Sequence, residues 1–112
     1  MAYEKTALAV TLDGSGNGTA VATSSTTDAR VAGFFLSQTN GPSSHSVVVT
    51  ITDTVGGRSN VYQNQLSLSV NDPPGIFVGN AASEGVGTGP FTFTFSGGPA
   101  NRTYYLLVYF EI

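Results

Sequence analysis

Apolar and polar residues alternate along most of this chain, and glycine or proline interrupts the alternation at almost every break. Residues 45–55 are the clearest example, because Val47, Val49 and Ile51 face one way while threonines at positions 50, 52 and 54 face the other. A period of two residues is that of a β-strand with one buried face, and β-branched side chains favour the pleated backbone. The alternation therefore predicts an all-β protein.

The alternating segments also predict the number and arrangement of the strands. We expect strands at residues 6–13, 19–23, 30–38, 45–55, 61–70, 76–78, 91–95 and 103–112. Seven or eight short strands separated by turn residues are typical of two packed antiparallel sheets. The expected fold is an antiparallel β-sandwich, jelly-roll-like or immunoglobulin-like, with about seven to eight strands in a single domain of residues 1–112.

Two of the breaks are expected to be hairpin turns. The first runs from Asp13 to Gly18, where Asn17-Gly18 can adopt the positive φ angles of a tight turn. The second contains Gly56-Gly57 and joins residues 45–55 to residues 61–70. Each hairpin would pair two strands that follow one another in the sequence.

Residues 103–112 depart from the pattern, because both faces of this strand are apolar or aromatic. The two faces are formed by Tyr104, Leu106, Val108 and Phe110, and by Tyr105, Leu107 and Tyr109. This composition indicates either a central strand that is buried on both sides or a strand whose outer face is covered by another subunit.

Residues 30–38 also lack a clearly polar face. Simple alternation places Ala32, Phe34 and Leu36 on one side of the strand and Val31 and Phe35 on the other. A partner surface is therefore expected where the polar half of the alternation disappears, at residues 31–35 and 105–109.

The chain carries little charge, with 4 Lys and Arg, 7 Asp and Glu and a net charge of −3, whereas Ser, Thr, Asn and Gln occupy 36 of its 112 positions. A nucleic-acid partner requires a clustered basic surface, and the basic residues here are few and scattered. The same scarcity argues against binding to anionic membranes, and no apolar stretch approaches the roughly 18 residues of a membrane span. We expect neither nucleic acid nor membrane as a partner. The N-terminus lacks a signal-peptide pattern, so we expect synthesis in the cytoplasm.

No arrangement of residues predicts an enzyme, a metal site or a cofactor site. Asp13 to Gly18 places oxygen-bearing side chains at alternate positions, as a calcium loop does, but the twelfth position is Ser24 rather than a carboxylate. The single histidine, His45, lies among serines and is expected to be a polar side chain at a loop edge. Five carboxylates lie at expected turns and lack the aromatic cleft residues of a glycosidase; they are Asp13, Asp28, Asp53, Asp72 and Glu84.

Two segments carry a resemblance to a known group of proteins. Residues 10–21 form an expected strand, a Gly-Asn-Gly turn and a second strand, and residues 104–112 form an aromatic strand that ends the sequence. In these segments, and in its cysteine-free composition rich in Thr, Ser and Gly, the chain resembles capsid decoration (cement) proteins of tailed bacteriophages and similar small virion structural proteins.

This resemblance implies a function, a partner and a location. Decoration proteins bind the outside of an assembled phage head and stabilise it, so the implied partner is the major capsid protein. The implied state is a homo-oligomer, with a trimer slightly preferred. The implied location is the capsid surface of the virion, after synthesis in the host cytoplasm.

The candidate interface residues are Phe35, Tyr105, Leu107 and Tyr109, with Tyr3 and Tyr62 as weaker candidates. The competing interpretation is that all of them belong to the core. A different functional class also fits the sequence, namely a carbohydrate-binding or adhesive β-sandwich of the tail-fibre or lectin type. Its sugar site would combine the ring of Tyr62 with the amides of residues 63–65.

Overall fold

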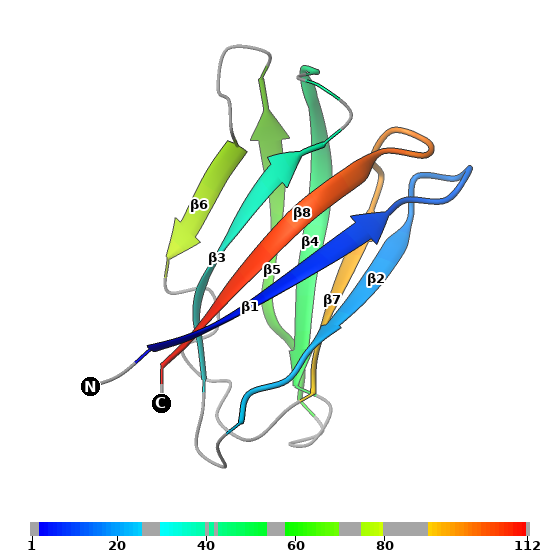
Figure 1. The fold of residues 1–112 in the computed structure, drawn as a ribbon. Coiled ribbons are helices and arrows are strands. Elements are labelled where there is room, and N and C mark those ends of the chain that lie inside the picture. The colour runs from blue at the N-terminus through cyan, green and yellow to red at the C-terminus, as the bar shows by residue number, and fades with distance from the viewer. Residues whose placement is uncertain are drawn as a thin grey trace.

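Eight antiparallel strands in two packed sheets make up the regular structure of the described part of the chain (Figure 1). The computed structural model describes residues 3–25, 30–39, 41, 43–53, 58–69, 75–79 and 90–111. The strands are β1 (Tyr3–Thr11), β2 (Gly18–Ala22), β3 (Arg30–Gln38), β4 (His45–Asp53), β5 (Arg58–Leu68), β6 (Gly75–Gly79), β7 (Phe91–Ser96) and β8 (Thr103–Glu111). Each expected strand is present, and the prediction of an all-β sandwich is confirmed.

The strand order is that of a jelly roll. One sheet has the order β1-β8-β3-β6 and the other has the order β2-β7-β4-β5. First and last strands pair, as do second and seventh, third and sixth, and fourth and fifth, so the chain is one long folded hairpin wrapped into two layers. Figure 1 shows β1 and β8 crossing in front of β4 and β7. This order differs from the immunoglobulin arrangement, which was the other expectation.

The expected hairpin at residues 13–18 is wrong, because β1 and β2 belong to different sheets. β1 pairs with β8 and β2 pairs with β7, so this connection crosses from one layer to the other. Asp13 closes the turn, since its N–H donates to the Asn17 carbonyl at 2.8 Å and its carbonyl accepts from the Gly16 N–H at 3.1 Å. The positive φ belongs to Gly16, at 80°, rather than to Asn17 or Gly18.

The second expected hairpin is confirmed. β4 and β5 pair in antiparallel register from His45 opposite Leu68 to Asp53 opposite Arg58. The connection that contains Gly56-Gly57 lies outside the described residues, as do most of the expected loops at residues 71–75 and 79–90.

The core lies between the sheets and is dominated by aromatic rings. The ring of Phe34 meets that of Phe93 edge-on, with ring centroids 5.5 Å apart, and Phe95 stacks on Tyr104 at 5.9 Å. Such offset and edge-to-face pairs contribute stabilisation beyond the area that they bury. The buried apolar residues are Val10, Leu12, Ala22, Val31, Phe34, Leu36, Val47, Val49, Ile51, Leu66, Leu68, Phe91, Phe93, Phe95, Tyr104, Leu106, Val108 and Phe110.

A β-bulge in β3 corrects the face assignment made from the sequence. Val31 lies opposite Phe110 and Gly33 lies opposite Tyr109, so Ala32 is the extra residue and the alternation is reset. Val31 is consequently fully buried in the core, where simple alternation had placed it on the outer side with Phe35. Simple alternation grouped Ala32 with Phe34 and Leu36, which are buried in the core, but Ala32 lies on the outer side of the sheet.

Candidate binding face

The outer surface of the β2-β7-β4-β5 sheet is polar. Its side chains form short cross-strand contacts, in which the Gln63 amide donates to the Thr50 hydroxyl at 3.1 Å and the Gln65 amide donates to the Ser46 hydroxyl at 3.0 Å. The other outward residues of this sheet are Thr19, Val21, Val48, Thr52, Ser67, Thr92, Thr94 and Ser96. Hydroxyl and amide groups therefore hydrate this side of the sandwich.

The outer surface of the β1-β8-β3-β6 sheet is mainly apolar, and we call it the apolar face. Its described residues are Tyr3, Lys5, Ala7, Ala9, Ala32, Gly33, Phe35, Phe77, Gly79, Tyr105, Leu107, Tyr109 and Glu111, with the polar Thr11, Ser37 and Thr103 toward its margin. The largest exposed rings on it are Tyr3, Phe77 and Tyr105, with 60%, 59% and 40% of their surface accessible. A contiguous surface of this kind is typical of a binding site.

The structure brings all four candidate interface residues together on the apolar face. Leu107 lies between Ala7 and Phe35, and Phe35 lies beside Phe77 on the next strand. Tyr105 and Tyr109 point outward on either side of Leu107 along β8. β8 is indeed a central strand, as one interpretation required, but only its core side is fully buried and its other side faces outward. The role of these residues as an interface stays a prediction.

Of the two weaker candidates, Tyr3 lies on the apolar face and Tyr62 does not. Tyr62 is half-buried and packs edge-on against Phe34 in the core, with ring centroids 5.8 Å apart. Gln63 and Gln65 lie on the opposite side of β5. Asn64 lies on the same side of β5 as Tyr62, so the ring shares a side with one of the three amides and not with the two glutamines.

The sequence did not identify Phe77 as a surface residue. Residues 76–78 are flanked by glycine and are too few to reveal which side of a strand is outward. Pairing of β6 with β3 decides it, because Phe77 lies opposite Phe35 and shares its outer side.

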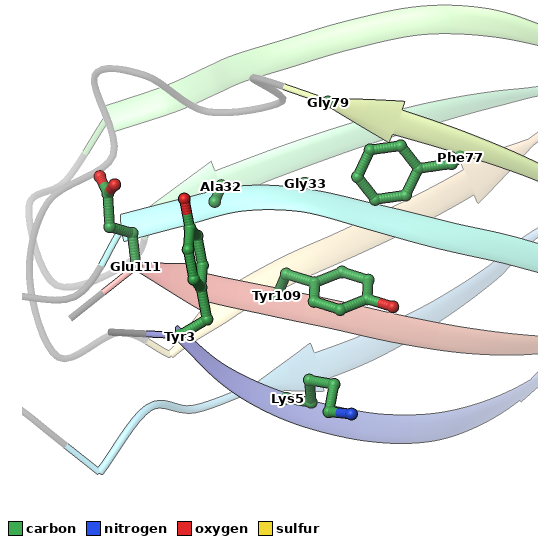
Figure 2. A pocket seen from close by; sticks show the side chains of 8 residues that line it. All are labelled: Tyr3, Lys5, Ala32, Gly33, Phe77, Gly79, Tyr109 and Glu111. Atoms are coloured by element: carbon green, nitrogen blue, oxygen red, sulfur yellow. The ribbon is translucent and has the colours of Figure 1, made fainter. Parts of the chain in front are cut away.

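An open hollow lies at one end of the apolar face, and we call it the hollow. Its volume is about 610 Å³, and all four strands of the sheet contribute to it (Figure 2). The Phe77 and Tyr109 rings meet edge-on there, with centroids 5.7 Å apart. The residues that line the hollow are Tyr3, Lys5, Ala32, Gly33, Phe77, Gly79, Tyr109 and Glu111.

The Asp13 carboxylate, considered above as part of a calcium-like loop, is used by its own turn. It accepts hydrogen bonds from the backbone N–H groups of Ser15 at 2.8 Å and Asn17 at 3.0 Å. The Asn17 bond, followed by that of Ser15, lowers the pKa of Asp13. Within the described ranges no three His, Cys, Asp or Glu side chains group as metal ligands would. The candidate carboxylates of residues 28, 53, 72 and 84 lie outside the described side chains.

His45 is less exposed than a loop-edge residue would be. It begins β4 and is half-buried, and its Nε2 lies 2.6 Å from the Tyr104 hydroxyl. Desolvation, followed by the positive charge of Arg102, lowers the pKa of His45. Burial raises the pKa of Tyr104 to about 12. The imidazole–phenol contact therefore joins a neutral histidine to a neutral tyrosine near neutral pH.

Two further findings concern the chain as a whole. Among the described residues, no helix has the length and apolar character that would let it cross a membrane. Comparison of the chain with protein-family models, curated proteins and solved structures yields no match.

Proposed function

We propose that this protein is a structural component of a virus particle, a decoration protein that binds the outside of an assembled tailed-phage head and stabilises it. The apolar face is the observation that carries the proposal. One side of the sandwich is hydrated by hydroxyl and amide groups, while the other exposes Tyr3, Phe77 and Tyr105. Burial of this second surface against a protein would remove apolar area from water at a gain of roughly 25 cal/mol per Å².

The dimensions of the apolar face suit a contact that is repeated many times. Four strands about 4.8 Å apart and nine residues at about 3.3 Å each span roughly 500 Å² on one partner. Two such surfaces bury roughly 1,000 Å², which is the lower end of specific interfaces. An oligomer that binds several sites of a symmetric shell multiplies this modest contact through effective concentration. The proposed partner is the major capsid protein, and the proposed state is a homo-oligomer, with a trimer preferred.

A carbohydrate-binding function remains the alternative, because jelly rolls include both viral capsid and lectin domains and a fold does not determine function. A sugar requires several hydrogen-bonding groups around its hydroxyls. Among the described side chains of the apolar face, the charged groups are those of Lys5 and Glu111, and the remaining polar groups are the tyrosine hydroxyls and the hydroxyls of Thr11, Ser37 and Thr103 toward its margin. This composition favours a protein partner.

The test is binding of the purified protein to expanded phage heads that lack it. We expect saturable binding at a copy number set by the shell symmetry, and heads that withstand higher temperature. Tyr105→Ser and Leu107→Ser together should weaken binding roughly tenfold or more, because both truncate the middle of the apolar face. Val21→Ser is the matched control, since Val21 is 51% exposed on the polar sheet.

The folded state of each variant is checked by its circular dichroism spectrum and thermal transition. If the double variant unfolds, Tyr105→Ser alone, at a ring that is 40% exposed, provides the comparison. Equal binding by the wild type and by these variants would contradict docking through the apolar face. Binding to glycans on an array without binding to heads would replace the proposal by its alternative.

A further inference from the structure

The floor of the hollow is formed by residues that lack large side chains. Gly33 of β3 lies directly opposite Gly79 of β6, and the bulge residue Ala32 precedes Gly33 on the same outer side. Glycine within a strand often marks a place where another group approaches the backbone closely. Here neither glycine has a side chain that could fill the depression; Gly79 is exposed, whereas Gly33 is buried with the ring of Phe77 beside it.

The walls of the hollow are aromatic rings, and Gly33 allows one of them to lie flat. A Cβ atom at Gly33 would be 2.6 Å from the Val78 carbonyl oxygen and 3.0 Å from Cζ of Phe77. The ring of Phe77 therefore lies across the glycine and meets Tyr109 edge-on, while Tyr3 stands at the other side of the opening (Figure 2). Aromatic rings 4.5–7 Å apart attract one another in such geometries, so the walls favour a further ring.

The charges at the hollow favour a neutral occupant. Among the described side chains, Lys5 and Glu111 are the charged ones that line it, and their charges are opposite. A charged side chain would meet one like charge for each opposite one and would lose its hydration. A neutral aromatic side chain does not have this cost. The backbone N–H and C=O groups of the partner beside that side chain can pair with Glu111 and Lys5, respectively.

We propose that the hollow is the anchor pocket of the docking surface and receives one aromatic side chain from the partner polypeptide. This inference rests on the proposed function, because it identifies which part of the apolar face supplies most of the affinity. Binding energy at protein interfaces is concentrated in a few aromatic residues that fill pockets on the partner. The hollow has the size of a ligand pocket and continues directly into the row formed by Leu107 and Phe35.

Two variants alter the hollow without touching the middle of the apolar face. Phe77→Ala removes one wall. Gly79→Val fills the floor, and the structure has room for it, because a Cβ atom at Gly79 would meet only Cε2 of Phe77 within 4 Å, at 3.4 Å. Gly14→Val is the matched control, since a Cβ atom there meets nothing within 4 Å and Gly14 lies outside the hollow.

Binding of these variants to expanded heads then tests the anchor pocket independently of the wider docking surface. We expect Phe77→Ala and Gly79→Val each to weaken binding roughly tenfold or more, and Gly14→Val to leave it unchanged. If Tyr105→Ser with Leu107→Ser weakens binding while both hollow variants bind normally, the anchor is wrong and the docking surface stands. If no variant alters binding, or the wild type does not bind heads, both proposals fail.

A second measurement tests the hollow without any shell. N-acetyl-tryptophanamide, N-acetyl-leucinamide and methyl glucoside are titrated into isotope-labelled protein and followed by NMR. The aromatic amide should shift the backbone resonances of Lys5, Phe77 and Gly79 in a saturable manner, more strongly than the leucine amide, and Gly79→Val should abolish the shifts. Stronger binding of the glucoside, or no response to the aromatic amide, would overturn the proposal.

Discussion

At the scale of single residues, Gly16 shows how one position joins two turns that are far apart in the sequence. Its φ of 80° lies in the left-handed region, and a Cβ atom would be 2.0 Å from the Gly98 carbonyl oxygen. The Gly16 carbonyl also accepts a hydrogen bond from the Gly98 N–H at 3.1 Å. The connection between β1 and β2 therefore packs against the connection between β7 and β8 only if residue 16 has no side chain.

Gly16→Ala should destabilise the protein more than its small size suggests. The left-handed backbone alone costs an alanine roughly 1–2 kcal/mol, and the contact with a backbone oxygen adds to this. Gly14→Ala is the control, because Gly14 lacks a positive φ and has open space around it; it should be neutral or slightly stabilising, by up to about 1 kcal/mol. Urea unfolding measures both variants, and equal stabilities would contradict the role given to Gly16.

At the scale of strands, β3 shows that one inserted residue can exchange the two sides of a strand. The bulge between Val31 and Gly33 turns Val31 into the core and Ala32 outward. Bulges occur preferentially beside functional sites, where they redirect side chains. In this sheet the redirected Ala32 borders the hollow, while the buried Val31 closes the end of the core against Phe110.

Truncation of valines distinguishes the two sides of the sandwich. Val31→Ala should lower the free energy of unfolding by about 2 kcal/mol, because it removes the two buried γ-methyl groups and leaves a cavity. Val21→Ala makes the same chemical change at a residue that is 51% exposed, so its effect should stay below about 0.5 kcal/mol. Denaturant titration of both variants tests the bulge, since an outward Val31 would give two small and similar effects.

At the scale of the whole molecule, three groups that titrate at acidic pH link stability to proton uptake. The Glu4 carboxylate ties β1 to the segment after β2, accepting hydrogen bonds from the Ser24 hydroxyl at 2.7 Å, the Ser25 N–H at 3.0 Å and the Ser25 hydroxyl. The Ser25 hydroxyl, then that of Ser24, lowers the pKa of Glu4 below its ordinary 4.5. The pKa of Asp13 is likewise below its ordinary 3.8, and that of His45 is below 6.5.

Acidification should therefore destabilise the protein in two steps. Below pH 6.5 the unfolded chain protonates its histidine while the folded protein resists protonation, so the free energy of unfolding falls. The contributions of Glu4 and Asp13 are present above their ordinary pKa values and are lost as pH falls through their lowered ones. Urea midpoints between about pH 8 and about pH 5 should fall for the wild type and stay nearly flat for His45→Gln. An equal slope in both proteins would assign the first step to another group.

Local patterns in the sequence determined the strands, the contrast between the faces of most strands and the four outward candidates on β3 and β8. Burial of one side of a strand imposes a period of two on consecutive residues, and that period is visible without knowledge of the neighbours. In the β2-β7-β4-β5 sheet, the outward positions of this period are occupied mainly by Thr, Ser and Gln, so uncharged polar side chains cover that surface.

Only the tertiary structure decided how the strands are ordered, where the alternation is reset and which residues share the hollow. Residues 13–18 look like a hairpin in sequence, yet the pairing of β1 with β8 and β2 with β7 makes them a bridge between layers. The hollow joins Tyr3, Gly33, Phe77 and Tyr109 from four different strands. Pairing between distant segments depends on how whole sheets pack, so no local pattern contains it.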